Sequence, residues 1–301
     1  MKNGRNVLCR CGSGMKYKRC CLLKERDTDV SFHQQSPILV NHVNQNHHGK
    51  PVVMTTTNEP FMPIRLYYTI CHMNTFLKNI RALDCITFAE PHHFYVSYWK
   101  EAKNLGLSVK HTDVPKPLYP IIIAHGFIMK DHTLHLNLRS FDRGLKMIEW
   151  INQHIKSTDL RLTHIASYNA LTYVNESTIH STMSHDYDEF LSEQTLTILK
   201  PEDVRDRLEK ATALIHDPTE KMRVTTQLLK HMEEEAFARA EKYPAHYYED
   251  GIESIEFALN LRLLVAIEHW KGNTHCKPID LIRHGLNKEE ALQKLLNHST
   301  S

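Results

Sequence analysis

The chain has 301 residues, 41% of them apolar and 24% charged, and its formal net charge is +2. These values are typical of a globular protein with a sizeable core and exclude a strong overall field toward nucleic acid or membranes. No stretch reaches the roughly 20 apolar residues that a membrane-spanning helix needs. The most apolar window, Leu259–Ile267, is interrupted by Arg262.

The first 26 residues are basic and dense in cysteine. Four of the seven cysteines, Cys9, Cys11, Cys20 and Cys21, fall within this segment. Their clustering differs from the dispersed spacing of a disulfide scaffold and offers the four thiolates that a structural zinc ion prefers. Gly12-Ser13-Gly14 supplies a turn directly after the second cysteine. A unit this small cannot be held together by apolar burial, so metal binding would provide its folding energy.

The cysteine spacing and the residues around it form a specific pattern. The spacing is Cys-x-Cys-x8-Cys-Cys, accompanied by Gly4-Arg5-Asn6, Gly12-Ser13-Gly14 and Lys16-Tyr17-Lys18. This pattern closely resembles the SEC-C motif, the zinc-binding element at the C-terminus of the SecA translocation ATPase and an appendage on many bacterial proteins. The chain departs from the family at Val7-Leu8, where Asp-Pro is usual, and at Arg10, where proline is usual.

The resemblance implies one structural Zn²⁺ bound by Cys9, Cys11, Cys20 and Cys21. In SecA the element contacts the chaperone SecB and the ribosome, which implies a docking role for residues 1–26 here. The segment also carries eight Lys and Arg residues against one acid, so nucleic acid is a further possible partner. A redox-active Cys20-Cys21 pair and thiols without a role are the alternatives to zinc binding.

Residues 27–50 are rich in His, Gln and Asn and predict a flexible polar tether. Residues 51–175 predict an α+β domain with a mainly antiparallel sheet and helices on one sheet face. In this domain Val52–Thr56 could be a strand, and Leu66–Ile80 has helical length. Pro91 is placed to begin a helix that runs through Asn104.

A β-hairpin is predicted over residues 121–139. Ile121–Met129 is apolar, and Thr133–Arg139 alternates leucine with polar residues, the period of a half-buried strand. A tight turn at Lys130-Asp131 would join the two strands. Ser140 then caps a helix with an apolar stripe that ends at Ile155, and a β-rich run follows over Leu160–Val174.

Residues 176–301 predict a mainly helical region, all-helical from about residue 195, that forms a C-terminal helical bundle. Pro201 begins one helix, and Lys221–Glu241 continues in good helix formers. Ile252–Trp270 is apolar around most of its circumference and predicts the central buried helix of the bundle. Asn287 with Glu290 resembles a capping box for the last helix.

Other chemistry-bearing residues give weaker signals. His180, His185 and Asp186 lie in a polar loop and could converge on a second metal ion or an enzyme site. His92-His93 is expected in the cap region of a helix, and Cys276 as a loop thiol. The acids of the helical region, Glu241, Glu256 and Glu268 among them, are expected to form a solvated face.

The sequence therefore predicts an α+β protein with an N-terminal zinc knuckle and a C-terminal helical bundle. The preferred function is a non-enzymatic adaptor whose residues 1–26 dock on a ribosome, a chaperone or nucleic acid. The alternative is an enzyme, a hydrolase or nuclease-like effector, that the knuckle localises. Clustered cysteines, and no apolar run behind the basic N-terminus, predict the reducing cytoplasm and no secretory signal.

Overall fold

The computed structural model describes residues 39–40, 52–173, 187–233, 235–245, 252–284 and 288–297. Contacts divide the chain into one unit up to Pro37 and a second unit from Ile38, and every described residue belongs to the second. The expected zinc knuckle and most of the expected tether therefore lie outside the described residues.

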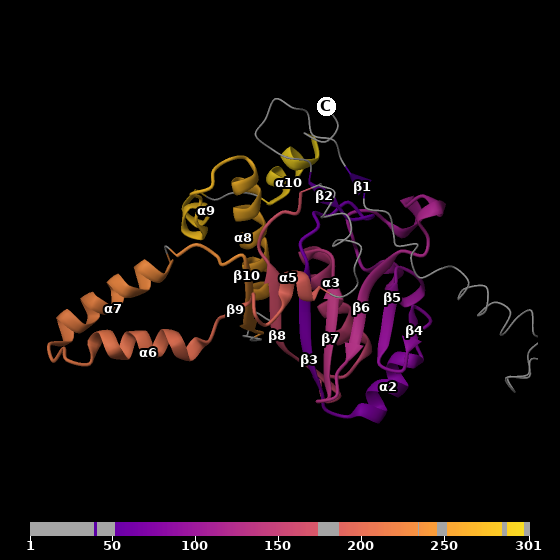
Figure 1. Cartoon of the computed structure of the whole chain (residues 1–301), viewed down its shortest axis with the longest axis horizontal. Coiled ribbons are helices and arrows are strands. Elements are labelled where there is room, and N and C mark those ends of the chain that lie inside the picture. The colour runs from indigo at the N-terminus through magenta and orange to yellow at the C-terminus, as the bar shows by residue number, and fades with distance from the viewer. Residues whose placement is uncertain are drawn as a thin grey trace, which may run out of the picture. The chain divides into compact units, whose positions relative to one another are not determined.

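An eight-stranded sheet forms the centre of the described fold, with its strands in the order β4-β5-β6-β7-β3-β8-β10-β9 (Figure 1). All neighbours pair antiparallel except β9 and β10, which are parallel. This arrangement confirms an α+β fold with a mainly antiparallel sheet. The strands are β3 (Ile64–Ile70), β4 (Ile86–Glu90), β5 (His93–Ser97), β6 (Ile122–Ile128), β7 (Thr133–Leu138), β8 (Leu160–Tyr168), β9 (Thr197–Ile198) and β10 (Ala240–Pro244). The short strands β1 (Leu39–Val40) and β2 (Val53–Met54) pair separately.

The two faces of the sheet are covered by different helices. The helices α2 (Met73–Arg81), α3 (Phe141–His154) and α8 (Glu253–Trp270) share one apolar core with the inward side chains of the strands. The short helix α5 (Asp188–Leu191) packs on the opposite face, where Phe190 meets Tyr168 with ring centroids 5.2 Å apart. The expectation that the helices of residues 51–175 cover one sheet face is therefore correct for α2 and α3.

The predicted hairpin and the helix after it are confirmed. β6 and β7 pair antiparallel, with Ile128 opposite Leu134 across the turn. The leucines of β7 face the core because side chains alternate between the faces of a strand. Ser140 caps α3 as expected, since its hydroxyl oxygen accepts a hydrogen bond from the backbone nitrogen of Arg143 at 3.2 Å. At Gly126 on β6 an added Cβ would lie 2.2 Å from the ring of Phe94, so this position has no room for a side chain.

One predicted helix is correct only in its second half, and another is wrong. The window Leu66–Ile80 contains most of β3 and then most of α2, because its first half consists of the aromatic, Leu, Ile and Thr residues that favour a central strand. The helix expected from Pro91 is instead β5, in which Phe94 and Val96 alternate into the core. Only the 3₁₀ turn Lys100–Asn104 lies at the expected helical end, and two further turns follow at His111–Asp113 and Lys116–Leu118.

The C-terminal part of the chain is helical but also contributes to the sheet. Its further helices are α6 (Pro201–Thr212), α7 (Pro218–Glu233), α9 (Pro278–His284) and α10 (Lys288–Asn297). β9 and β10 lie within this part, so the expectation of an all-helical region from residue 195 is wrong. α8 contacts α3, α9 and α10, while a separate helical bundle stays a prediction. No helix in these described segments combines the length and apolar character needed to cross a bilayer.

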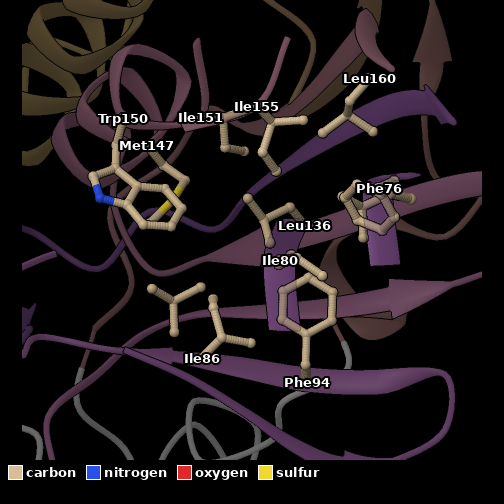
Figure 2. Close-up of a pocket in the computed structure, with 12 residues that line it drawn as sticks. Phe76, Ile80, Ile86, Phe94, Leu136, Met147, Trp150, Ile151, Ile155 and Leu160 are labelled. Carbon is tan, nitrogen blue, oxygen red and sulfur yellow. The ribbon is translucent and has the colours of Figure 1, made fainter. Parts of the chain in front are cut away.

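A small void lies in the core between α2, α3 and the sheet (Figure 2). Phe76 and Ile80 of α2 face Met147 and Trp150 of α3 across it, and Leu136 of β7 lines its sheet side. All twelve lining residues have apolar or aromatic side chains. A void of this kind, with no convergent polar groups, is a packing feature and offers no chemistry.

Candidate functional site

The residues that the sequence singles out most strongly lie outside the described part of the chain. Two groups are concerned, and both stay predictions. They are the zinc ligands Cys9, Cys11, Cys20 and Cys21 and the alternative group His180, His185 and Asp186. The described body shows how its own histidines, thiols and charged side chains are used.

Two histidines meet on the sheet face opposite α3. His93 on β5 and His125 on β6 approach to 3.5 Å between Nε2 and Nδ1, and His93 stacks on Phe127 with centroids 4.5 Å apart. Burial lowers the pKa of His93, which favours its neutral form. The sequence analysis expected His93 in the cap region of a helix. The structure places it at the start of strand β5 instead. Among the residues that the structure describes, no three His, Cys, Asp or Glu side chains are grouped to hold a metal ion.

His132 and His135, three positions apart in the sequence, do not form a pair either. His132 occupies the β6–β7 turn with a φ of 64°, whereas His135 lies within β7 and meets the ring of Tyr67 with centroids 4.7 Å apart. Burial, reinforced by the positive charges of Arg65 and Lys242, lowers the pKa of His135 to about 4. His135 therefore packs as a neutral ring.

The three cysteines of the body are free thiols, one exposed and two buried. Cys71 is exposed, while Cys85 and Cys276 are buried. Burial, followed by the hydrogen bond to Glu101, raises the pKa of Cys85 to about 12, and burial also raises the pKa of Cys276. Because the thiolate is the reactive form, both buried thiols are poor nucleophiles. Cys276 follows α8 in a turn, as expected for a loop thiol.

Glu241 does not belong to a solvated acidic face, so the sequence prediction is wrong for this residue. Its side chain is 5% exposed and its Oε2 accepts hydrogen bonds from Nε and a terminal nitrogen of Arg262 at 3.0 and 2.8 Å. The strand β10, which the sequence had suggested to be helix, carries Glu241 into the core. Glu256 of α8 is exposed as expected, and Glu268 pairs with Lys271 at 2.7 Å.

A second buried ion pair joins Glu59 to Arg143 of α3. Arg143 Nε lies 3.3 Å from Glu59 Oε2, and the two side chains are 1% and 0% exposed. The hydroxyl groups of Thr55 and Thr57 also donate to Glu59. Sequence reasoning missed this network, because Glu59 and Arg143 are 84 positions apart and neither belongs to a recognisable motif. Since both charges are closed off from solvent, the pair is structural and does not form a reaction site.

A cleft of about 480 Å³ opens at the end of β8. It is lined by residues of β8 and the chain after it, by α5 and by the start of β10, with Arg239 at its edge. Arg239 Nε donates to the hydroxyl of Tyr168 at 2.7 Å, and its guanidinium carbon lies 5.3 Å from the centre of that ring. Sequence reasoning also missed this cleft, because its lining residues come from three separate segments.

Comparisons with known proteins give one match, which falls on the N-terminal segment. Residues 5–23 match the family model of the SEC-C motif. Neither the curated proteins nor the solved structures include a match to the chain. The match covers all four cysteines of the expected knuckle and leaves the body without a family assignment. The chain therefore carries a SEC-C motif at residues 5–23.

Proposed function

We propose that this protein is an adaptor whose residues 1–26 bind one Zn²⁺ and attach the folded body to a macromolecular partner. The observation that carries the proposal is the SEC-C match over residues 5–23. The body is a second unit that begins at Ile38. Binding of residues 1–26 to the partner would bring this unit to it. A site of four thiolates requires reduced cysteines, so we place the protein in a reducing compartment, the cytoplasm.

The donor set fits a structural zinc ion. Cys9, Cys11, Cys20 and Cys21 supply four sulfur ligands, the number and type that a closed tetrahedral zinc site uses. The bound metal would tie the two cysteine pairs together and give the segment its folded form. No water or substrate position is needed in such a site, so its expected role is to hold a binding surface in shape.

The charge of the segment indicates the kind of surface it would meet. Eight Lys and Arg residues stand against Glu25 alone, and four thiolates with Zn²⁺ would carry about −2. The metal-loaded segment thus keeps a positive charge, which favours an acidic partner surface through faster encounter and correct orientation. An acidic protein or ribosomal surface is the preferred partner.

The zinc content of purified protein tests the metal site. Wild-type protein should contain about one zinc ion per chain, and Cys20→Ser should lose most of it because one of four thiolate ligands is gone. Mass spectrometry of the metal in protein purified without chelator gives the content. Cys71→Ser is the matched control, since Cys71 is an exposed thiol of the body, and it should keep its zinc. Equal zinc content in the two variants would contradict the assigned ligands.

A crosslinked pull-down with the full chain tests the attachment. Wild-type and Cys71→Ser protein should capture the same partners, whereas Cys20→Ser should lose those that bind through residues 1–26. The proposal fails if Cys20→Ser loses its zinc and still retains every wild-type partner. Capture that survives nuclease treatment supports a protein surface; capture that is lost with nuclease and falls steeply with salt identifies nucleic acid as the partner instead.

A further inference from the structure

The cleft at the end of β8 has the size and construction of a small-molecule site. Its volume of about 480 Å³ lies within the range of roughly 300–1,000 Å³ that is usual for ligand pockets. Its buried walls are apolar and aromatic, formed by Leu171, Phe190 and the ring of Tyr168. The backbone of this wall is fixed, because Val53 of β2 donates to the carbonyl oxygen of Thr172 at 2.8 Å. The cleft is therefore part of the folded sheet and not a gap at a loose end.

The guanidinium of Arg239 lines the cleft and has donors that are not used within the described protein. Tyr168 fixes the Nε side of Arg239, as described above. The terminal nitrogens of this guanidinium make no hydrogen bond to the residues that the structure describes. Burial raises the pKa of Tyr173, and the positive charge of Arg239 acts in the opposite direction, so the field of Arg239 reaches the cleft wall. A guanidinium that is held at Nε, and whose two terminal nitrogens have no partner among the described residues, has the fork geometry that binds a carboxylate in a bidentate manner.

A buried hydroxyl in the same cleft also lacks its hydrogen bond. Thr172 lines the cleft and is 5% exposed, and its Oγ1 finds no hydrogen-bond partner among the described residues. Buried polar groups are nearly always paired, because leaving one unpaired costs free energy. This hydroxyl is independent of Arg239, and a polar atom of a ligand that reached it from the cleft would satisfy it.

We infer that the cleft binds a small monoanionic carboxylate with an aromatic or apolar body. The apolar walls would receive the body of the ligand, Arg239 its carboxylate, and the Thr172 hydroxyl a second polar atom. Glu189 also lines the cleft and is exposed, so the described lining residues carry one positive and one negative charge. This balance disfavours a polyanion such as a nucleotide triphosphate or a nucleic acid. The inference concerns the body alone and does not depend on the zinc proposal.

Titration of the full chain with 2-naphthoate tests the site, with 2-naphthamide as the neutral control of the same shape. Isothermal calorimetry should show saturable binding of the carboxylate with about one site per chain, and at least tenfold weaker binding of the amide. Arg239→Gln should weaken binding of 2-naphthoate at least tenfold. Arg161→Gln is the matched control and should bind as wild type, because Arg161 is an exposed arginine on β8, the strand of Tyr168, and does not line the cleft.

Thr172→Val separates a ligand-binding role from a structural one. Because the buried hydroxyl has no partner among the described residues, replacing it with a methyl group of similar size should leave the melting temperature unchanged or raise it. The same change should weaken binding of 6-hydroxy-2-naphthoate, which carries a second polar atom, several-fold and leave binding of 2-naphthoate unchanged. A lower melting temperature in Thr172→Val would show that the hydroxyl is satisfied within the protein, which would overturn its assigned role. Equal binding of 2-naphthoate and 2-naphthamide, or no saturable binding of 2-naphthoate, would overturn the carboxylate site itself.

Discussion

Replacing Arg143 with methionine should lower the free energy of unfolding of the body by about 3–5 kcal/mol, the usual effect of removing one partner of a buried ion pair. The substitution takes away the cation that lies 3.3 Å from Glu59 and leaves that carboxylate at 0% exposure. An isolated buried charge is far less stable than the same charge in water. Chemical denaturation followed by tryptophan fluorescence measures the change, since Trp150 and Trp270 are both in the core.

The network around this pair explains why neighbouring groups cannot compensate. Arg143 also donates to Thr57 Oγ1 at 2.7 Å and to the carbonyl oxygen of Ile122 at 3.2 Å. Its guanidinium therefore connects the turn at residues 55–59, strand β6 and helix α3. Burial lowers the pKa of Arg143, and the adjacent Glu59 counteracts that effect. The threonine hydroxyl groups can stabilise Glu59 by hydrogen bonding, but they carry no charge to balance it.

Two further variants make this prediction decisive. Lys146→Met on the same helix removes a surface ion pair whose side chains are 40% and 41% exposed, and it should cost no more than about 1 kcal/mol. The double variant Arg143→Met/Glu59→Gln should recover part of the loss, because the unpaired charge is gone. If Arg143→Met were no more destabilising than Lys146→Met, the buried pair would not contribute as its geometry indicates.

The parts of the fold that the sequence predicts well are those with an unambiguous local pattern. The alternation of leucine in Thr133–Arg139 defines one core face, so β7 and its hairpin partner were predictable. Ser140 is followed by an apolar stripe of helical period, so α3 and its cap were predictable too. In both cases the apolar residues lie on one face of a single element. The pattern that predicts the element is therefore contained within about fifteen residues.

Prediction fails where the sheet as a whole decides the structure. β3 is a central strand buried on both faces, so Leu66–Ile70 shows no alternation and reads equally well as a buried helix. β10 reads as a continuation of the helix before it, and its strand form depends on pairing with β8, more than 70 positions away. The Arg239 cleft was not predictable for the same reason, because it forms only when β8, α5 and β10 come together. The SEC-C motif, by contrast, could be recognised from the sequence alone, because the spacing of its cysteines identifies it without any knowledge of the fold.

Glu241→Ala should also destabilise the body by about 3–5 kcal/mol, because it leaves the buried charge of Arg262 without its carboxylate partner. Arg262 is the charge that interrupts the most apolar window of the sequence, and the structure gives the reason for it. Its guanidinium lies between the rings of Phe237 and Tyr243, 4.4 and 4.5 Å from their centres, and binds Glu241 through two nitrogens. Removing the carboxylate leaves Arg262 with these rings and the carbonyl oxygen of Ala258, to which it donates at 3.0 Å. Neither cation–π attraction nor one neutral acceptor replaces a buried carboxylate.

The same carboxylate also organises the end of the sheet, so the effect should extend beyond α8. Glu241 accepts hydrogen bonds from Asn169 Nδ2 and from the backbone nitrogen of Ala238, each at 2.9 Å. Hydrogen exchange in Glu241→Ala should therefore become faster both in α8 and in β10. Glu256→Ala, on the exposed side of α8, is the control and should cost less than about 1 kcal/mol. Exchange that quickens in α8 while β10 stays protected would show that Arg262 anchors only its own helix and that Glu241 does not join the helix to the sheet.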